Sequence, residues 1–308
     1  MTTVLFIGGL GRSGSTLLDR TLGQVPGMVA VGELVFLWER GLINNELCGC
    51  GEPVGRCPFW RAVGDAALGG WNGSDIPAIE ALRRRVDRNR FVPLMRAPLL
   101  SSSYARDLRR YTQILGRLYA GIARVSGAQV VVDSSKHVST YELLRRVPGV
   151  SRRLVHLVRD PRAVAFSWGR RIQRPDVVDR EVYMPVLSPG RSAQKWIAYN
   201  TAFDALRGGG PRILQRYEDL VGSPAEEVRR VLSLVGMGDA ELPFLDGNRL
   251  QLGTEHTISG NPSKFRTGSI DITADEEWRR AMPVSARSVV TAITWPGLIR
   301  FGYLGAAR

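Results

Sequence analysis

The sequence has little of three kinds of side chain that serve in many enzyme active sites. Its 308 residues include 3 cysteines and 3 histidines, and only three of its 42 basic residues are lysine. So few cysteines exclude a small disulfide-stapled scaffold. No apolar run approaches about 18 residues, so we expect no transmembrane helix. The start "MTTVLFIGG" lacks the basic residues that open a secretory signal, so we expect a cytoplasmic protein.

Positive charge is abundant, and almost all of it comes from arginine. The net charge is +13, which fits a polyanionic partner such as a nucleotide, a nucleic acid or an acidic membrane surface. Arginines gather between residues 81 and 124, where we expect two arginine-rich helices around "VPLMRAP". The span holds no recognisable nucleic-acid-binding motif. We therefore favour solvated helical faces there and expect no specific nucleic-acid partner.

The three cysteines lie close together in "LCGCGEPVGRCPFW", as Cys48, Cys50 and Cys57. They could bind zinc if a fourth ligand came from elsewhere, although the usual C-x-x-C knuckle is absent. One disulfide with one free thiol is an equal alternative. Reduced, structural cysteines are the default in a chain without a secretion signal. The sequence leaves these alternatives open, and we assign no metal ligand.

Four apolar strand patterns alternate with helical patterns along the chain. We expect strands in "TVLFIGG" and at about 128–135, 152–160 and 211–220, each leading into a helix. This alternation predicts an α/β fold: a P-loop-like three-layer sandwich whose parallel sheet is flanked by helices on both faces. Sites in such sheets lie at the carboxyl ends of the strands.

We expect a single domain over residues 1–308, with a variable insertion of helices and loops at about 40–127. Glycine- and proline-rich stretches predict loops at 44–76, 174–191 and 238–272, and the last is a candidate lid. The insertion and the loop 174–191 are expected to shape a pocket for a second substrate. Aromatic side chains of the insertion could line it: Trp38, Phe59, Trp60 and Trp71.

The stretch "GGLGRSGST" at residues 8–16 follows the first strand and nearly matches the phosphate-binding loop G-x-x-x-x-G-K-[ST]. Ser15 takes the place of the lysine. A glycine turn at a helix N-terminus binds anions through backbone N–H groups and the helix dipole. Arg12 supplies positive charge instead of the lysine. A smaller anion than a triphosphate is therefore expected, bound without an obligatory metal.

At this point the sequence resembles the sulfotransferases that use 3′-phosphoadenosine 5′-phosphosulfate (PAPS). "GRSGSTLL" is similar to their 5′-phosphosulfate loop, in the arginine form of tyrosylprotein sulfotransferases and many bacterial members. The resemblance implies that the loop residues bind PAPS: Gly11, Arg12, Ser13, Gly14, Ser15 and Thr16. "LVRDPRAVAFSW" resembles the family's second motif, which implies that Arg159 and Ser167 bind the 3′-phosphate. An arginine fork suits a phosphate because it can donate two hydrogen bonds.

Two more segments carry the resemblance toward residue 280. "RYEDL" places Tyr217 where the family contacts the adenosine. "KFRTGSIDITADEEW" is similar to the segment that closes over the nucleotide, which implies roles for Arg266, Thr267 and Gly268, with Trp278 following. Thr267 departs from the family's usual lysine. The resemblance is weakest between residues 44 and 127.

Sulfuryl transfer needs a base for the acceptor proton and cations for the charge that develops on oxygen. The resemblance implies that Arg12 and Lys136 lie near the sulfuryl group. Two residues compete for the role of base, Glu33 in "VAVGELVFLW" and His137 in "VVVDSSKH". Glu33 could instead be a carboxylate at a helix N-terminus. His156 lies in a strand and is expected to be structural, whereas His256 could line the lid.

The sequence thus predicts an enzyme that moves a sulfuryl group from PAPS to a hydroxyl or amine and releases 3′,5′-adenosine bisphosphate. The expected acceptor is a small molecule, a glycoside or a lipid. The alternative is a nucleotide kinase or triphosphatase with an altered loop, in which Asp133 is the nearest candidate for the magnesium-binding aspartate. The oligomeric state stays open.

Overall fold

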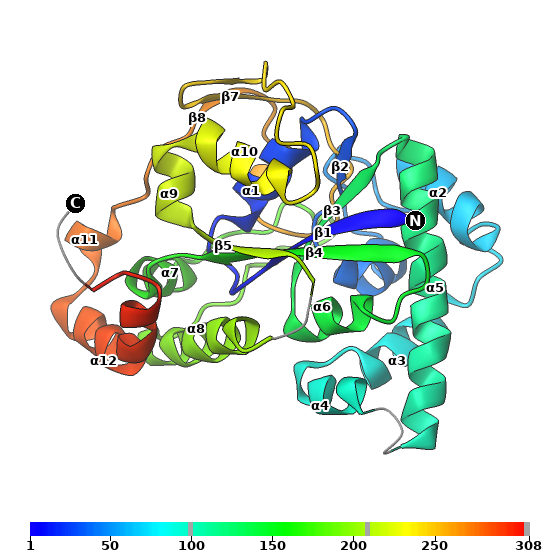
Figure 1. The fold of residues 1–308 in the computed structure, drawn as a ribbon, viewed down its shortest axis with the longest axis horizontal. Helices are drawn as coiled ribbons and strands as arrows, with labels where there is room; N and C mark the ends of the chain where they lie inside the picture. The colour runs from blue at the N-terminus through cyan, green and yellow to red at the C-terminus, as the bar shows by residue number, and fades with distance from the viewer. Residues whose placement is uncertain (98–100, 207–209, 305–308) are drawn as a thin grey trace.

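The computed structural model describes residues 1–97, 101–206 and 210–304. Its centre is a five-stranded sheet in the order β2-β3-β1-β4-β5 (Figure 1). All four neighbouring pairs are parallel. The strands are β1 (Thr2–Gly8), β2 (Met28–Ala30), β3 (Val130–Lys136), β4 (Val150–Val158) and β5 (Arg212–Arg216). This architecture confirms the predicted α/β fold, and β2 is an edge strand that the sequence patterns did not indicate.

Alternate residues of β1 pack on opposite faces of the sheet. Val4 and Phe6 belong to a core shared with α5 (Ser102–Ser126) and α6 (Val138–Leu144). Leu5 and Ile7 belong to a second core shared with α1 (Ser15–Gly23) and α10 (Pro224–Ser233). Both faces are therefore covered, which explains why these strands are continuous apolar runs rather than alternating ones.

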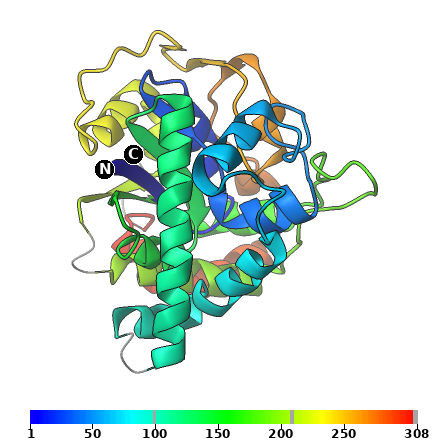
Figure 2. The ribbon, with the colours of Figure 1, turned by 90° about the vertical axis from the view of Figure 1, so that its right-hand side faces the viewer.

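The segment from residue 34 to 97 is largely helical, with α5 packed along it (Figure 2). The elements are η1 (Leu34–Phe36), η2 (Leu37–Ile43), α2 (Pro58–Leu68), α3 (Ile76–Val86), η3 (Asn89–Phe91) and α4 (Val92–Arg96). The prediction of a loop over 44–76 is wrong at α2, whose first residue is a proline, as suits that position. The aromatic residues expected to line a pocket belong to the core instead: Trp38 and Trp60 are fully buried, and Phe59 and Trp71 pack against them.

The C-terminal part adds helices beside the sheet and a small second sheet. The helices are α7 (Pro161–Trp168), α8 (Pro189–Asp204), α9 (Tyr217–Gly222), α11 (Trp278–Ala281) and α12 (Val284–Arg300). The span 238–272 is not the loop that we predicted. It contains η5 (Pro262–Phe265) and the antiparallel strands β6 (Leu245–Asp246), β7 (Arg249–Leu252) and β8 (Gly268–Asp271). The fourth predicted strand ends at Arg216, because "YEDL" forms the start of α9. Within the described ranges, no helix is long and apolar enough to cross a membrane.

Candidate functional site

A cavity of about 460 Å³ opens at the carboxyl edge of the parallel sheet. It is lined by the glycine loop after β1, by the ends of β3 and β4, and by segments around residues 184 and 260. Most of the residues predicted from the sequence line this cavity together: Gly11, Arg12, Gly14, Ser15, Thr16, Glu33, Lys136, His137, Arg159, Ser167 and Tyr217.

Two glycines of the loop are required by their surroundings. Gly9 has φ 133°, and a Cβ there would lie 2.2 Å from the carbonyl oxygen of Leu157. Gly14 has φ 90°, and a Cβ there would lie 2.4 Å from the ring of Tyr217. The loop is thus fitted closely against β4 and α9. Helix α1 then begins at Ser15 with no acidic residue in its first turn and no side-chain cap, so its N-terminal N–H groups are suited to an anion.

Two arginines bring positive charge to this wall of the cavity. The guanidinium of Arg12 lies over the ring of Trp168, 5.3 Å from its centroid, and its Nη2 donates to Met184 Sδ at 3.1 Å. The guanidinium of Arg159 lies over the ring of Tyr217 at 4.3 Å, and its Nη1 donates to the carbonyl oxygen of Arg12 at 3.2 Å. These contacts hold both cations at one end of the cavity.

Three buried polar atoms in the glycine loop and at the end of β4 lack hydrogen-bond partners among the residues that the structure describes. They are Arg12 Nε and Arg159 Nε, on residues that line the cavity, and Ser13 Oγ, on a residue that does not. A buried donor without a partner costs free energy, about 1–3 kcal/mol in typical proteins. Two guanidinium N–H groups and a hydroxyl suit an anionic ligand with several oxygens. The chemistry of this donor set therefore fits phosphate or phosphosulfate groups.

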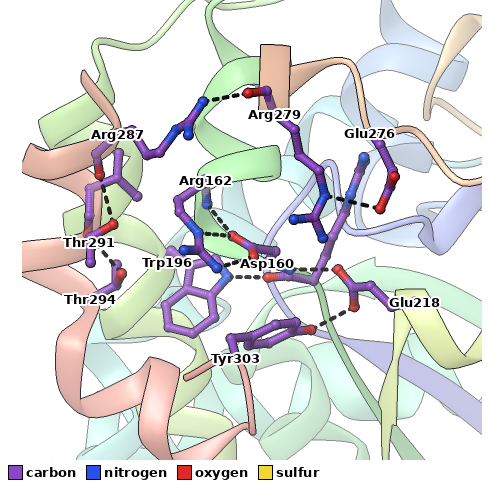
Figure 3. Close-up of polar contacts among 12 residues, drawn as sticks. Asp160, Arg162, Trp196, Glu218, Glu276, Arg279, Arg287, Thr291, Thr294 and Tyr303 are labelled. Atoms are coloured by element: carbon purple, nitrogen blue, oxygen red, sulfur yellow. Dashed lines mark hydrogen bonds and ion pairs between the residues drawn. The ribbon is translucent and has the colours of Figure 1, made fainter. Parts of the chain in front are cut away.

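The backbone around Arg159 is braced by a network of polar contacts (Figure 3). Trp196 Nε1 donates to the carbonyl oxygen of Arg159 at 2.9 Å. The next residue, Asp160, caps α7 through its carboxylate, and its own N–H donates to Glu218 Oε1 at 3.0 Å. Tyr303 Oη donates to the other oxygen of Glu218 at 2.8 Å. The end of β4 is thus tied to α8, α9 and the segment that follows α12.

The cavity lining also holds an ion pair, formed by Lys136 and Glu33. Lys136 Nζ donates to Glu33 Oε1 at 2.6 Å and to the carbonyl oxygen of Ser134 at 2.9 Å. The backbone N–H of Glu33 donates to the carbonyl oxygen of Ile258 at 2.8 Å, which fixes the carboxylate beside the sheet. Glu33 precedes η1, but its side chain makes no capping hydrogen bond there. Glu33 thus does stand at a helix N-terminus, as the alternative to a catalytic base expects, but its carboxylate contacts Lys136 and not the backbone N–H groups of the helix.

Backbone conformation at the cavity is unusual for residues other than glycine. In the described part of the chain, Arg12, Asn45, Lys136 and Ser259 are the non-glycine residues with positive φ. Three of these four line the cavity, with φ values of 72°, 66° and 56° for Arg12, Lys136 and Ser259. Such conformations cost free energy and often occur at functional sites. Two of the cations that line the cavity, Arg12 and Lys136, thus have strained backbone conformations.

His137 directly follows Lys136 in the sequence, and both residues line the cavity. Its ring lies 6.0 Å from that of Phe36 and 6.5 Å from that of Tyr199, measured between centroids. Burial lowers the pKa of His137 below its ordinary value of 6.5. The imidazole is therefore neutral at pH 7 and able to accept a proton.

Asp133, the candidate magnesium ligand, is fully buried and does not line the cavity. Its carboxylate accepts hydrogen bonds from Tyr119 Oη at 2.6 Å and from the N–H and hydroxyl of Ser135 at 2.9 and 2.5 Å. Burial raises its pKa. Asp133 is thus a structural group inside the core.

Some predicted residues lie apart from the cavity lining. Ser13, within the glycine loop, is buried and does not line the cavity. Gly268 begins β8, and the carbonyl oxygen of Arg266 accepts from Arg20 Nη1 at 2.5 Å. Arg266, Thr267 and Gly268 do not line the cavity, so their contact with a nucleotide stays a prediction. Trp278 is buried against α7.

Several cavity residues were not predicted. The segment 259–263 contributes Ser259, Gly260, Asn261 and Ser263, and other elements contribute Phe36, Arg40, Met184, Lys195, Tyr199 and Asp275. Asp275 Oδ2 pairs with Arg159 Nη2 at 3.1 Å. Arg40 Nη1 donates to Ser259 Oγ at 2.7 Å. Met184 lies in the loop 174–191 and Arg40 at the start of the insertion, the two segments that were predicted to shape a pocket, and 259–263 lies in the candidate lid 238–272.

The fold is similar to those of three solved sulfotransferases. The sulfotransferase domain of the olefin synthase from Synechococcus PCC 7002 is 21% identical over 95% of this chain and 94% of that chain, with a TM-score of 0.50. The sulfotransferase domain from the curacin biosynthetic pathway is 16% identical over 96% and 97%, with a TM-score of 0.49. A sulfotransferase from Alicyclobacillus acidocaldarius is 14% identical over 97% and 94%, with a TM-score of 0.43. Neither a protein-family model nor a curated protein matches the sequence.

The alignment with the olefin synthase domain spans nearly all of both chains. The likeness therefore includes the parallel sheet and the helices that cover it, not the glycine loop alone. The chain has the fold of a sulfotransferase domain.

Proposed function

We propose that this protein is a PAPS-dependent sulfotransferase. The observation that carries the proposal is the pair of unpartnered buried donors on cavity-lining residues, Arg12 Nε and Arg159 Nε, beside a glycine turn at a helix N-terminus. They suit a ligand that carries two separate anionic groups. The fold is compatible with this activity.

The two anionic groups of PAPS would bind to different parts of the cavity lining. The glycine loop with Arg12 would hold the 5′-phosphosulfate, and Arg159 with Ser167 would hold the 3′-phosphate. Tyr217 lies between the loop and Arg159, because its ring contacts both. Its position suits a contact with the nucleoside.

In the proposed reaction, an acceptor hydroxyl or amine attacks sulfur, and the bond between sulfur and the bridging phosphate oxygen breaks. The proton passes to Glu33, with His137 as the competing base. Lys136 and Arg12 stabilise the charge that develops on the sulfuryl and bridging oxygens. 3′,5′-adenosine bisphosphate leaves with the electron pair of the broken bond. Because Lys136 Nζ contacts Glu33 directly, the lysine also holds the carboxylate in place.

The alternative is a kinase or triphosphatase with an altered loop. It needs a lysine supplied from outside the loop and an acid for magnesium. Lys136 lines the cavity, but it is paired with Glu33. The expected acid, Asp133, is enclosed by Tyr119 and Ser135. This arrangement favours the sulfotransferase.

Thermal unfolding in the presence of ligands tests the proposal. 3′,5′-adenosine bisphosphate should stabilise the protein by about 2.7 kcal/mol at a concentration of 100 Kd. ATP with magnesium and DNA are the comparison ligands. Stabilisation by ATP with magnesium alone would overturn the proposal and favour the triphosphatase.

The acceptor is expected to be a small molecule, a glycoside or a lipid. The free side of the cavity combines rings, as in Phe36 and Tyr199, with polar groups such as Arg40 and Asn261. This mixture suits an amphipathic acceptor. A screen of these three acceptor classes with radiolabelled PAPS would identify the class, and transfer in an excess of EDTA would show that no dissociable metal takes part.

A further inference from the structure

The three cysteines and His256 form a cluster outside the cavity. The four possible ligand atoms, three Sγ and Nδ1 of His256, all lie within 4.8 Å of one another. Cys50 Sγ lies 3.7 Å from Cys57 Sγ, while His256 Nδ1 lies 3.2 Å from Cys57 Sγ and 3.8 Å from Cys48 Sγ. All three cysteines are free thiols. The ligand that the cysteine motif lacked thus comes from a segment about 200 residues away in the sequence.

These separations match tetrahedral zinc coordination. With Zn–S near 2.3 Å and Zn–N near 2.0–2.1 Å, ligand atoms of a tetrahedral site lie about 3.5–3.8 Å apart. Two of the three distances above, 3.7 and 3.8 Å, fall in this range, the third is shorter at 3.2 Å, and the remaining pairs lie within 4.8 Å. Thiolate and imidazole are also the ligands that zinc prefers in structural sites.

The surroundings hold the four side chains in place. Cys57 is the residue before α2, and the N–H of Cys48 donates to the carbonyl oxygen of Glu52 at 2.8 Å. The ring of His256 stacks on Phe59, with centroids 4.9 Å apart and planes inclined by 9°. Trp60 Nε1 donates to the carbonyl oxygen of His256 at 2.9 Å. Contacts of this kind, from neighbouring residues to the ligating residues, orient the ligands in protein metal sites.

We propose that Cys48, Cys50, Cys57 and His256 bind one structural Zn²⁺ ion. Four protein ligands leave no open position for a substrate, so the ion is structural rather than catalytic. Binding releases the thiol protons to solvent. None of the four residues lines the cavity, and the proposal does not depend on sulfuryl transfer.

The ion would hold together two segments that are distant in the sequence. One is the loop 46–57, and the other is the stretch 255–258, whose Ile258 pairs with Gly32 in a parallel bridge. The chain then passes directly to Ser259, Gly260 and Asn261, which line the cavity. Zinc would therefore support the segment that faces Glu33, at a distance from the chemistry.

Metal analysis of the purified full-length chain tests the proposal. We expect about one zinc ion per chain, and a near-complete loss of zinc in Cys57→Ser and in His256→Gln. His137→Gln is the matched control, because it removes a histidine outside the cluster and should keep its zinc. A wild-type protein that neither contains zinc nor takes up added Zn²⁺, or that holds iron or a disulfide among these cysteines, would overturn the proposal.

Two measurements on the wild-type chain do not depend on folded variants. Replacement by Co²⁺ should give the thiolate-to-cobalt absorption and the intense visible bands of a tetrahedral site; bands of an octahedral site would contradict the assignment. Removal of the metal by a chelator should raise hydrogen exchange at 46–57 and 255–261 more than in β1 and β4. Unchanged exchange in both segments would show that no ion fastens them.

Discussion

The cavity lining holds two cations that each contact a carboxylate, Lys136 with Glu33 and Arg159 with Asp275, but the two pairs differ in how they are enclosed. Lys136 and Glu33 are both largely buried, with side chains 13% and 14% exposed. Arg159 is 7% exposed, whereas its partner Asp275 is 38% exposed. Arg159 also keeps a buried Nε without a partner among the described residues. A ligand can thus displace Asp275 more easily than Glu33.

This difference separates two tasks. Arg159 has a donor that still needs an acceptor, so ligand affinity should depend strongly on it. The ion pair of Lys136 and Glu33 is already formed, and a ligand gains less by binding to it. These two groups are instead held in a fixed geometry, as proton transfer requires. Substitution of Arg159 should therefore change affinity, and substitution of Glu33 should change turnover.

The largest effect is expected from Glu33→Gln. Glutamine keeps the size of the side chain and can still accept a hydrogen bond from Lys136, but it cannot accept the acceptor's proton. Turnover should fall by about 10²–10⁴-fold, as is typical of losing a general base. The affinity for 3′,5′-adenosine bisphosphate should barely change. Steady-state kinetics with labelled PAPS and calorimetric titration measure the two quantities.

His137→Ala is the companion variant. Normal turnover in Glu33→Gln with a large loss in His137→Ala would make the histidine the base. Because burial lowers the pKa of His137, a histidine base would place the rising limb of the pH–rate profile below pH 6.5. Loss of bisphosphate binding in Glu33→Gln would contradict the expectation that Glu33 serves turnover and not affinity.

The fold has its own acid sensitivity, which must be known before such pH profiles are compared. His156 is buried in β4, where its Nε2 lies 3.0 Å from Asn200 Oδ1, and burial lowers its pKa from 6.5 to about 4. His156 therefore binds a proton less readily in the folded state than in the unfolded state. The stability that this histidine supports is complete above pH 6.5 and is lost as the pH falls to about 4, by about 3 kcal/mol.

Urea unfolding at several pH values checks this expectation. His156→Gln should show a smaller decline in the free energy of unfolding between pH 6.5 and 4 than the wild type. The difference between the two proteins removes the contribution of the carboxylates that both share. Parallel declines would mean that His156 does not titrate as its burial implies.

Arg159→Ala should weaken ligand binding. The family resemblance assigns this residue to the 3′-phosphate, and a charge-assisted contact contributes about 1.5–3 kcal/mol. The dissociation constant of 3′,5′-adenosine bisphosphate should rise about ten- to a hundredfold. That of adenosine 5′-phosphosulfate, which lacks the 3′-phosphate, should change much less. Equal losses for both ligands would make Arg159 a structural residue.

The same comparison explains which parts of the site could be predicted from the sequence. The glycine loop and the end of β4 are local patterns, in which a strand, a turn and a helix follow one another, so Arg12 and Arg159 were found. Asp275 and the segment 259–263 reach the cavity through contacts between distant parts of the chain. His256 reaches the cysteines in the same way. No spacing in the sequence indicates such pairs.

The fold followed the same rule. The apolar runs of β1, β3 and β4 identified the parallel sheet, because strands buried on both faces have a strong local signal. β2 has three residues, too few for a periodic pattern. The small sheet of β6, β7 and β8 lies in a span rich in glycine and proline, where strands of two to four residues resemble a loop.

The smallest expected effect is a gain in affinity, from Asp275→Asn. The carboxylate of Asp275 competes with a phosphate for the guanidinium of Arg159. Pairs with a partly exposed partner contribute about 0.2–1 kcal/mol, so removal of the charge should tighten bisphosphate binding by roughly 1.4- to fivefold. Glu276→Gln is the matched control, because it removes the same charge one residue away, from a side chain that is 62% exposed, pairs with Arg279 and does not line the cavity. Calorimetric titration at low and high salt would separate a local effect from a general one. Equal tightening in both variants would indicate the net charge of the segment, and weaker binding in Asp275→Asn would show that this carboxylate positions Arg159 instead of competing for it.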